Sequence, residues 1–268
     1  HHGHLAVLLQ WAEFIIIGGC AIGAYVIGNT GPVIKGSIAR LTGLLKPNPY
    51  APKVYADLLT MLYGIMQIAA RDGLVGLDAH IEEPEKSSVF KKYPFFLKNH
   101  HAVDFFTDTL KSLSSGAIED HHLADVLDSD LEKHHAEEKL VTSALTKMGD
   151  AMPGFGIVAA VLGVIITMQS IGGSAAEIGE KVAAALVGTF LGILLAYGLI
   201  GPIVQAIESR IESEHAYLLV IRAALLAFAR GDAPKQTTEA ARRSLEPHVR
   251  PSFSTLEGLM KGTKAQAA

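Results

Sequence analysis

The chain has 268 residues, of which 49% are hydrophobic, and its mean hydropathy is +0.30, which is high for a water-soluble enzyme. The net charge of −4 gives no electrostatic reason to expect a nucleic acid as partner. The single cysteine, Cys20, lies inside an apolar run, so a disulfide framework is excluded.

Three apolar stretches predict membrane-spanning helices. Residues 14–27 form the first, which is short for a span but is lengthened by an apolar segment upstream. Residues 151–168 are interrupted only by Thr167, and residues 182–204 contain neither a charged nor an amide side chain. Because a hydrocarbon core of about 30 Å requires about 20 helical residues, both of these qualify as spans. Glu13 lies at the outer edge of the first stretch, where we expect its carboxylate to reach the membrane surface.

Basic residues flank the spans unevenly, and this predicts the orientation of the chain. One side has only Lys181, in the short loop between the second and third spans. The other side has seven basic residues: Lys35, Arg40, Lys46, Lys139, Lys147, Arg210 and Arg222. Residues 29–150 and 208–268 are therefore expected in the cytoplasm and the N-terminus outside it, which suggests a start partway into a longer protein.

The predicted fold class is all-α. The expected parts are an outer loop and spanning helix (1–28), a helical cytoplasmic domain (29–150), a two-helix membrane hairpin (151–207), and a cytoplasmic C-terminal helix and tail (208–268). Within the second part, residues 53–73 show helical apolar spacing and end in glycine, a common helix stop. The final residues, KGTKAQAA, are polar and are expected to be disordered.

Small residues recur at every fourth position of the third span and predict a helix face on which backbones approach closely. They are Ala184, Gly188, Gly192 and Ala196. This face packs either on the chain's own helices or in a tight assembly with other chains. Thr189 lies beside it, and its hydroxyl either bonds a carbonyl of its own helix or lines an ion path.

Two prolines border the longer spans. Pro153 begins the second span, where proline suits the first turn of a helix. Pro202 lies near the end of the third span, where the loss of a backbone hydrogen bond kinks a helix and provides a hinge.

Twelve histidines invite a test for a metal site, but their pattern does not support one. Most occur as adjacent pairs, which point about 100° apart on a helix. Glu119 and His122 form one Glu-x-x-His pair, whereas a di-metal bundle needs two such pairs and further carboxylates. We expect solvated surface histidines and no metal. No motif of an enzyme active site is found.

Five segments stand out as a set: AEFIIIGGCAIGAYVIGN, YADLLTMLYGIM, MPGFGIVAAVLGVI, AALVGTFLGILLAYGLIGP and the late RPSF. Through these segments the chain resembles the MotA family of flagellar stator subunits over essentially its whole length. The resemblance implies a bacterial inner-membrane protein with four membrane helices, the first of which would precede this sequence. It also implies a ring of five copies around two MotB membrane helices, with MotB supplying the aspartate that accepts the proton.

The resemblance further implies roles for individual residues. These are Thr189, Ala160 and Tyr197 for the ion path, Pro153 and Pro202 for conformational coupling, and Arg71, Asp78 and Asp130 for the contact with the rotor protein FliG. Ala159 and Ala160 stand where sodium-driven relatives have Gly-Thr, so the expected coupling ion is the proton rather than sodium, and no cofactor is expected.

The expected function is therefore a proton-conducting stator subunit that, with MotB, converts ion flow into torque on FliG. A TolQ/ExbB-type energiser of envelope transport would show the same three helices in the same orientation and is the alternative. A purely structural membrane scaffold is a third interpretation. The RPSF segment, the region of Pro202 and the charged turn at Asp78 favour the motor.

Overall fold

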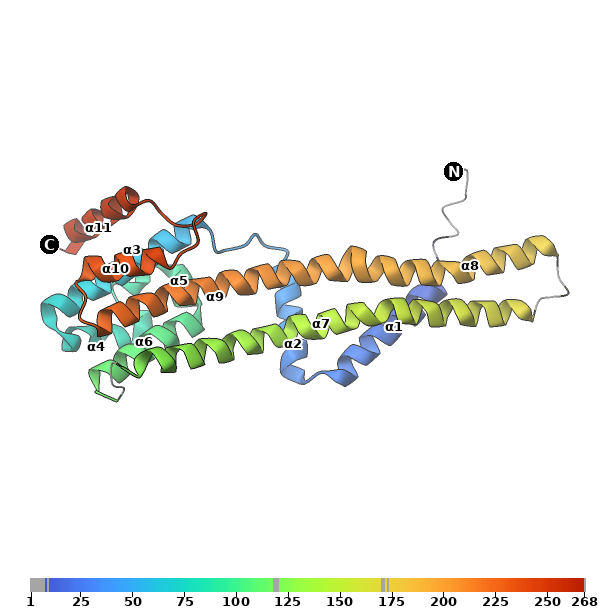
Figure 1. The fold of residues 1–268 in the computed structure, drawn as a ribbon, viewed down its shortest axis with the longest axis horizontal. Coiled ribbons are helices and arrows are strands. Elements are labelled where there is room, and N and C mark those ends of the chain that lie inside the picture. Colours follow the sequence, from blue (N-terminus) through green and yellow to red (C-terminus); the bar gives the residue numbers. More distant parts are fainter. Residues whose placement is uncertain (1–7, 9, 118–120, 170–171, 173, 268) are drawn as a thin grey trace. The chain divides into compact units, whose positions relative to one another are not determined.

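The structure, a computed structural model, describes residue 8 and residues 10–117, 121–169, 172 and 174–267 (Figure 1). Every regular element within these residues is a helix, which confirms the predicted all-α fold. Three helices are long and apolar enough to cross a membrane: Trp11–Gly28, Leu123–Met168 and Ala175–Ala229. Each predicted span lies within one of them.

The chain divides into two compact units. The membrane unit comprises residues 1–47 and 136–209, and the head unit comprises residues 48–135 and 210–268. The sequence placed residues 29–47 and 136–150 in the cytoplasmic domain. In the structure they belong to the unit that contains the membrane helices.

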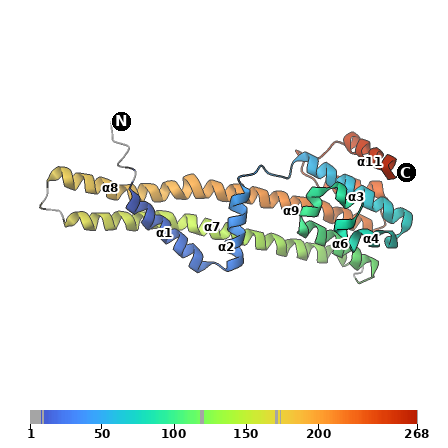
Figure 2. The ribbon, with the colours of Figure 1, turned by 180° about the vertical axis from the view of Figure 1, so that it is seen from behind.

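The membrane unit contains α1 (Trp11–Gly28), α2 (Gly31–Gly43), the second part of α7 (Leu123–Met168), α8 (Ala175–Ile193) and the helical segment that continues α8 to residue 209. Figures 1 and 2 both show α7 and α8 side by side. The buried apolar residues that join α1, α7 and the helix beginning with α8 are Ile17, Ala21, Met152, Ala159, Val187, Leu191 and Ala196. An ion pair between Arg40 and Glu138 connects α2 to α7.

The third span continues without a break into the segment that follows it. After α8 the helix passes through a π-helical turn, η5 (Leu194–Ile200), and then through α9 (Gly201–Ala229). Residues of α9 from Arg210 onward belong to the head unit.

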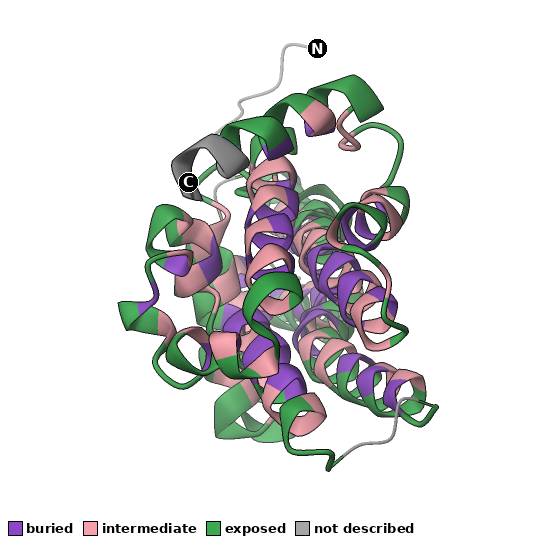
Figure 3. Ribbon diagram, turned by 90° about the vertical axis from the view of Figure 1, so that its left-hand side faces the viewer, coloured by how far each residue is buried: buried purple, intermediate pink, exposed green. Residues whose placement is uncertain are grey.

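The head unit packs its helices around large side chains. It contains α3 (Pro52–Asp72), α4 (Asp78–Ile81), α5 (Pro94–Lys98), α6 (His100–Ser114), the first part of α7, most of α9, α10 (Pro234–Arg243) and α11 (Phe253–Ala267), with short 3₁₀ turns at Leu74–Leu77, Pro84–Lys86 and Phe90–Lys92. Buried residues line the faces on which these helices meet (Figure 3). The rings of Phe90, Phe96 and Phe106 lie within 6.1 Å of one another, centroid to centroid.

Sequence anticipated one boundary in the head unit and missed another. Helix α3 ends at Gly73, whose φ of 71° lies in the left-handed region that glycine adopts without strain, as predicted. By contrast, the final polar residues, which were expected to be disordered, continue α11 through Ala267, and Ala268 lies outside the described residues. The apolar side chains Leu256 and Met260 of α11 are buried in the core, and this anchors a helix that composition alone does not indicate.

Candidate functional site

Helices α7 and α8 cross with their backbones in contact. A Cβ atom added to Gly156 of α7 would lie 2.6 Å from the carbonyl oxygen of Gly188 and 3.2 Å from the Cα of Gly192. A Cβ added to Gly192 would lie 2.6 Å from the carbonyl oxygen of Met152. Only glycine permits this approach, which explains the small residues predicted to pack helices.

Packing of the chain on itself therefore accounts for part of the small-residue face. Gly188 and Gly192 contact α7, and Ala196 is buried in the same apolar cluster. Ala184 is half-buried. The second interpretation, a face for other chains, stays a prediction for the residues that α7 does not cover.

Thr189 lies at this crossing with an uncommitted hydroxyl. Its Cα is 3.3 Å from the position of a Cβ on Gly156, and its side chain is half-buried. Within the described part of the chain the hydroxyl makes no hydrogen bond, whereas that of Thr167 donates to the carbonyl oxygen of Gly163 at 2.8 Å. The interpretation in which Thr189 bonds its own helix is therefore wrong.

Of the other two residues implied for the ion path, Ala160 is on α7 and Tyr197 lies well beyond Thr189 along its own helix. Ala160 is half-buried, and its neighbour Ala159 is the residue that faces α8, where its Cβ lies 3.2 Å from a Cβ placed on Gly188. Tyr197 is eight residues beyond Thr189, a rise of about 12 Å, and its ring is 68% exposed.

The two prolines lie in different helical environments. Pro153 is inside α7 and not in its first turn, because the helix begins far upstream of the apolar run. The expectation of an unstrained first-turn proline is thus wrong, and Pro153 removes a hydrogen bond from the helix interior. Pro202 is the second residue of α9, just after the π-helical turn, and the backbone N–H of the intervening Gly201 donates to the carbonyl oxygen of Ala196. π-Helical turns are sites of local adjustment. The kink and hinge at Pro202 stay a prediction.

Glu13 is buried against another helix and not exposed at the edge of its span, contrary to expectation. The residue is 8% exposed, and a Cβ on Gly188 would lie 2.5 Å from its Oε2 atom. The helix starts at Trp11, so Glu13 belongs to its first turn and packs inward with it. Apolar residues on both sides of Glu13 in the sequence were the signal for this position.

The three charges expected to meet a rotor protein are all exposed in the head unit. Arg71, at the end of α3, donates from Nε to Oδ1 of Asp72 at 2.9 Å. Asp78, at the start of α4, lines a groove of about 350 Å³, and Asp130 lines another of about 650 Å³ between α6 and α7. Ser112 lines both grooves, so these two acidic residues border neighbouring hollows.

Four histidines are not solvated as expected but pack in pairs inside the head unit. The rings of His101 and His134 stack with centroids 3.7 Å apart, and those of His135 and His215 lie 4.4 Å apart. Burial, followed by the neighbouring His134, lowers the pKa of His101, while nearby carboxylates act in the opposite direction. No group of metal ligands occurs among the described residues, and Glu119 lies outside them.

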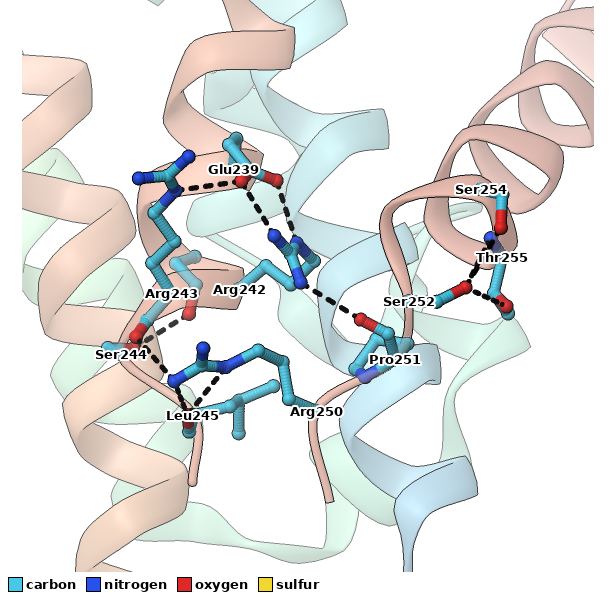
Figure 4. Close-up of polar contacts among 11 residues, drawn as sticks. Glu239, Arg242, Arg243, Ser244, Leu245, Arg250, Pro251, Ser252, Ser254 and Thr255 are labelled. Carbon is cyan, nitrogen blue, oxygen red and sulfur yellow. Dashed lines mark hydrogen bonds and ion pairs between the residues drawn. The ribbon is translucent and has the colours of Figure 1, made fainter. Parts of the chain in front are cut away.

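The RPSF segment has a structural role in the head unit (Figure 4). Arg250 donates from Nε to the carbonyl oxygen of Leu245 at 2.9 Å. Arg242 donates to the carbonyl oxygen of Pro251 at 3.1 Å and to both carboxylate oxygens of Glu239. Hydrogen bonds from Arg242 and Arg243 lower the pKa of Glu239 to about 2. These contacts fix the turn between α10 and α11.

Comparisons with known proteins identify the family of the chain. Residues 1–73 match the family described as motility protein A N-terminal, and residues 98–218 match the MotA/TolQ/ExbB proton channel family. Motility protein A of Salmonella typhimurium is 38% identical over 255 residues, which cover 95% of this chain and 86% of that protein. Motility protein A of Escherichia coli is 37% identical over 262 residues, 98% of this chain and 89% of that protein.

Solved structures share the fold. The MotAB structure from C. jejuni matches with a TM-score of 0.74 at 18% identity, over 94% of this chain and 91% of that one. The flagellar MotAB stator complex of Bacillus subtilis matches with a TM-score of 0.71 at 23% identity, over 95% and 89% of the two chains. The chain therefore belongs to the MotA/TolQ/ExbB proton channel family, as a multi-pass membrane protein of its MotA branch, the flagellar stator subunits.

Proposed function

We propose that this chain forms a proton-driven stator with MotB, as five copies around two MotB membrane helices in the bacterial inner membrane. Each MotB helix brings the aspartate that accepts the proton, and the head unit pushes the rotor protein FliG. Membership of the family supports this proposal, and so does the fold shared with solved MotAB structures. As a motor component, the chain is not an enzyme.

The observation that carries the proposal is the unbonded hydroxyl of Thr189. It lies where α7 and α8 touch through their backbones, in a stretch that has no charged side chain of its own between residues 182 and 204. An ion path through such a stretch needs a titratable group that the stretch itself does not carry, and the hydroxyl of Thr189 can hydrogen-bond to such a group.

The proposed coupling ion is the proton. Ala159 faces α8 and Ala160 is half-buried, and neither side chain carries an oxygen that could replace a water in the shell of a sodium ion. A hydroxyl at Thr189 and a carboxylate from MotB suffice to pass a proton.

Swimming rescue tests the proposal. Full-length protein and its own MotB would be expressed in cells that lack stators, and swimming would be measured with and without sodium. We expect rescue that does not depend on sodium. Rescue only in sodium would overturn the proposed ion, and restored envelope transport without motility would favour the TolQ/ExbB-type alternative.

Replacing Thr189 by valine tests the hydroxyl itself. Thr189→Val keeps the shape of the side chain, so assembly should persist while torque falls about tenfold or more, because hydrogen bonds to charged groups contribute about 1.5–3 kcal/mol. Thr167→Val is the matched control, since that hydroxyl is already bonded to Gly163. Equal torque in the two variants, measured with tethered cells, would contradict the role of Thr189.

A further inference from the structure

Glu13 is the one carboxylate in the apolar spanning segments 11–28, 151–168 and 182–204. Its side chain is more than nine-tenths buried, and its Oε2 atom accepts no hydrogen bond from the described residues. A buried carboxylate without a partner is costly, so its presence calls for a function.

The carboxylate occupies the space that a side chain at position 188 would fill. A Cβ on Gly188 would lie 2.5 Å from Oε2 and 3.2 Å from the carboxyl carbon of Glu13. Gly188 is six residues beyond Val182, so the contact lies about 9 Å along the helix from the start of the charge-free stretch. The carboxylate therefore lies within the span, against Gly188, the residue that precedes Thr189.

Two opposing effects act on the charge of Glu13. The carboxylate is buried, and the facing segments 151–168 and 182–204 bring no charged group. Burial therefore penalises the anion. Glu13 also lies in the first turn of α1, where the helix dipole favours a negative charge.

We propose that Glu13 is a second proton-binding group of the ion path, carried by this chain itself. A hydronium ion gives a proton to Oε2, which leaves water and a neutral carboxylic acid against Gly188. Release of that proton into the path beside Thr189 restores the carboxylate. The inference rests on the proposed function, and it adds a proton site before the aspartate of MotB.

Proton flux through the purified complex in lipid vesicles tests this inference. Glu13→Gln removes the proton site but keeps the side chain's size, so the complex should still assemble. We expect flux to fall at least about tenfold, because the amide of glutamine cannot take up and release a proton at this position, and the dependence of flux on outer pH to flatten. Glu13→Asp keeps a carboxylate and should keep the pH dependence at reduced flux. Glu180→Gln, at an exposed position of α8, is the control and should leave flux unchanged.

Infrared difference spectra between two pH values provide a measurement that does not depend on flux. The wild-type complex should show the carbonyl band of a protonated carboxyl group, and Glu13→Gln should lose it. If the wild type shows this band but carries no flux, the proposed channel fails while the proton site stands. The inference is overturned if the band survives in Glu13→Gln, or if both Glu13 variants keep the wild-type pH profile.

Discussion

The membrane unit and the head unit are both built from helices, but they pack in different ways. In the membrane unit Gly156, Gly188 and Gly192 bring two backbones into contact. In the head unit helices are held apart by large buried side chains such as Tyr217 and Phe106. Lipid is as apolar as leucine, so helices in a membrane gain little by burying large side chains against each other and associate through close contact. Water supplies the hydrophobic driving force for the head unit.

A matched pair of isoleucines tests this comparison with the largest expected effect. Ile65 in the head unit and Ile17 in the membrane unit are both 0% exposed. Ile65→Ala should cost about 2–5 kcal/mol, because it loses both the transfer free energy of the side chain and the packing around a cavity. Ile17→Ala should cost about half as much, because its side chain is in an apolar medium in either state.

Thermal unfolding of the purified complex measures the difference. Ile65→Ala should lower the midpoint by on the order of 10 °C and Ile17→Ala by clearly less. Ile27→Ala, at a site 88% exposed on the same helix as Ile17, is the control and should leave the midpoint in place. A larger loss from Ile17→Ala than from Ile65→Ala would mean that both units pack by the same physics.

Two glycines of one helix face sharpen the comparison within the membrane unit. A Cβ at Gly192 would meet the backbone oxygen of Met152 at 2.6 Å, and backbone cannot move cheaply. A Cβ at Gly188 would meet the far end of the Glu13 side chain at 2.5 Å, and that group can rotate away. Gly192→Ala should therefore destabilise the complex by about 1–3 kcal/mol, and Gly188→Ala by less.

Proton flux should rank the two variants in the opposite order from stability, with Gly188→Ala the more harmful. Gly188→Ala displaces the proposed proton site, so proton flux should fall while the complex assembles normally. Gly192→Ala should lower the yield of assembled complex before any effect on flux is seen. Similar yields of assembled complex from the two variants would show that the backbone contact between α7 and α8 at Gly192 does not exclude a larger side chain.

In the head unit, Glu239 gives a smaller effect that depends on pH. Its pKa is lowered from 4.5 to about 2, chiefly by the hydrogen bond from Arg242. A group with a lowered pKa in the folded state stabilises the fold above its unfolded pKa, and that contribution is lost as pH falls from about 4.5 towards 2. Glu239→Gln should cost on the order of 1 kcal/mol at neutral pH, since the pair is only partly shielded from water.

Unfolding of wild type and variant between pH 2 and 7 measures this contribution. The difference between the two proteins should shrink as pH falls through the window and vanish near its lower end. A constant difference across that range would mean that Glu239 acts through packing and not through its charge.

Much of the membrane unit could be predicted from sequence because lipid imposes simple rules. Length and the lack of charge identified the spans, and the spacing of Gly188 and Gly192 identified the close helix face. The burial of Glu13 was not predicted, because the edge of an apolar run does not show where a helix begins. The interior position of Pro153 was missed for the same reason, since α7 begins at Leu123, far outside the span.

The head unit was less predictable because its contacts join segments far apart in the chain. The stacking of His101 on His134 and the pairing of His135 with His215 bring α6, α7 and α9 together, and no local spacing reveals it. Sequence therefore treated these side chains as solvated. The same limit applies to the predicted rotor-binding charges, which the structure places on exposed positions without identifying their partner.

Arg71 gives the smallest expected effect on stability and separates stability from function. Its guanidinium and the carboxylate of Asp72 form an exposed pair that is screened by water, so Arg71→Ala should leave thermal unfolding unchanged. If Arg71 meets the rotor, the same variant should swim more slowly, and raised ionic strength should weaken the contact further. Arg230→Ala removes a comparable exposed pair with Asp232 and should slow nothing. Equal swimming of the two variants would assign the rotor contact to other charges. Asp78 and Asp130, which lie on neighbouring grooves of the head unit, would be the next residues to replace.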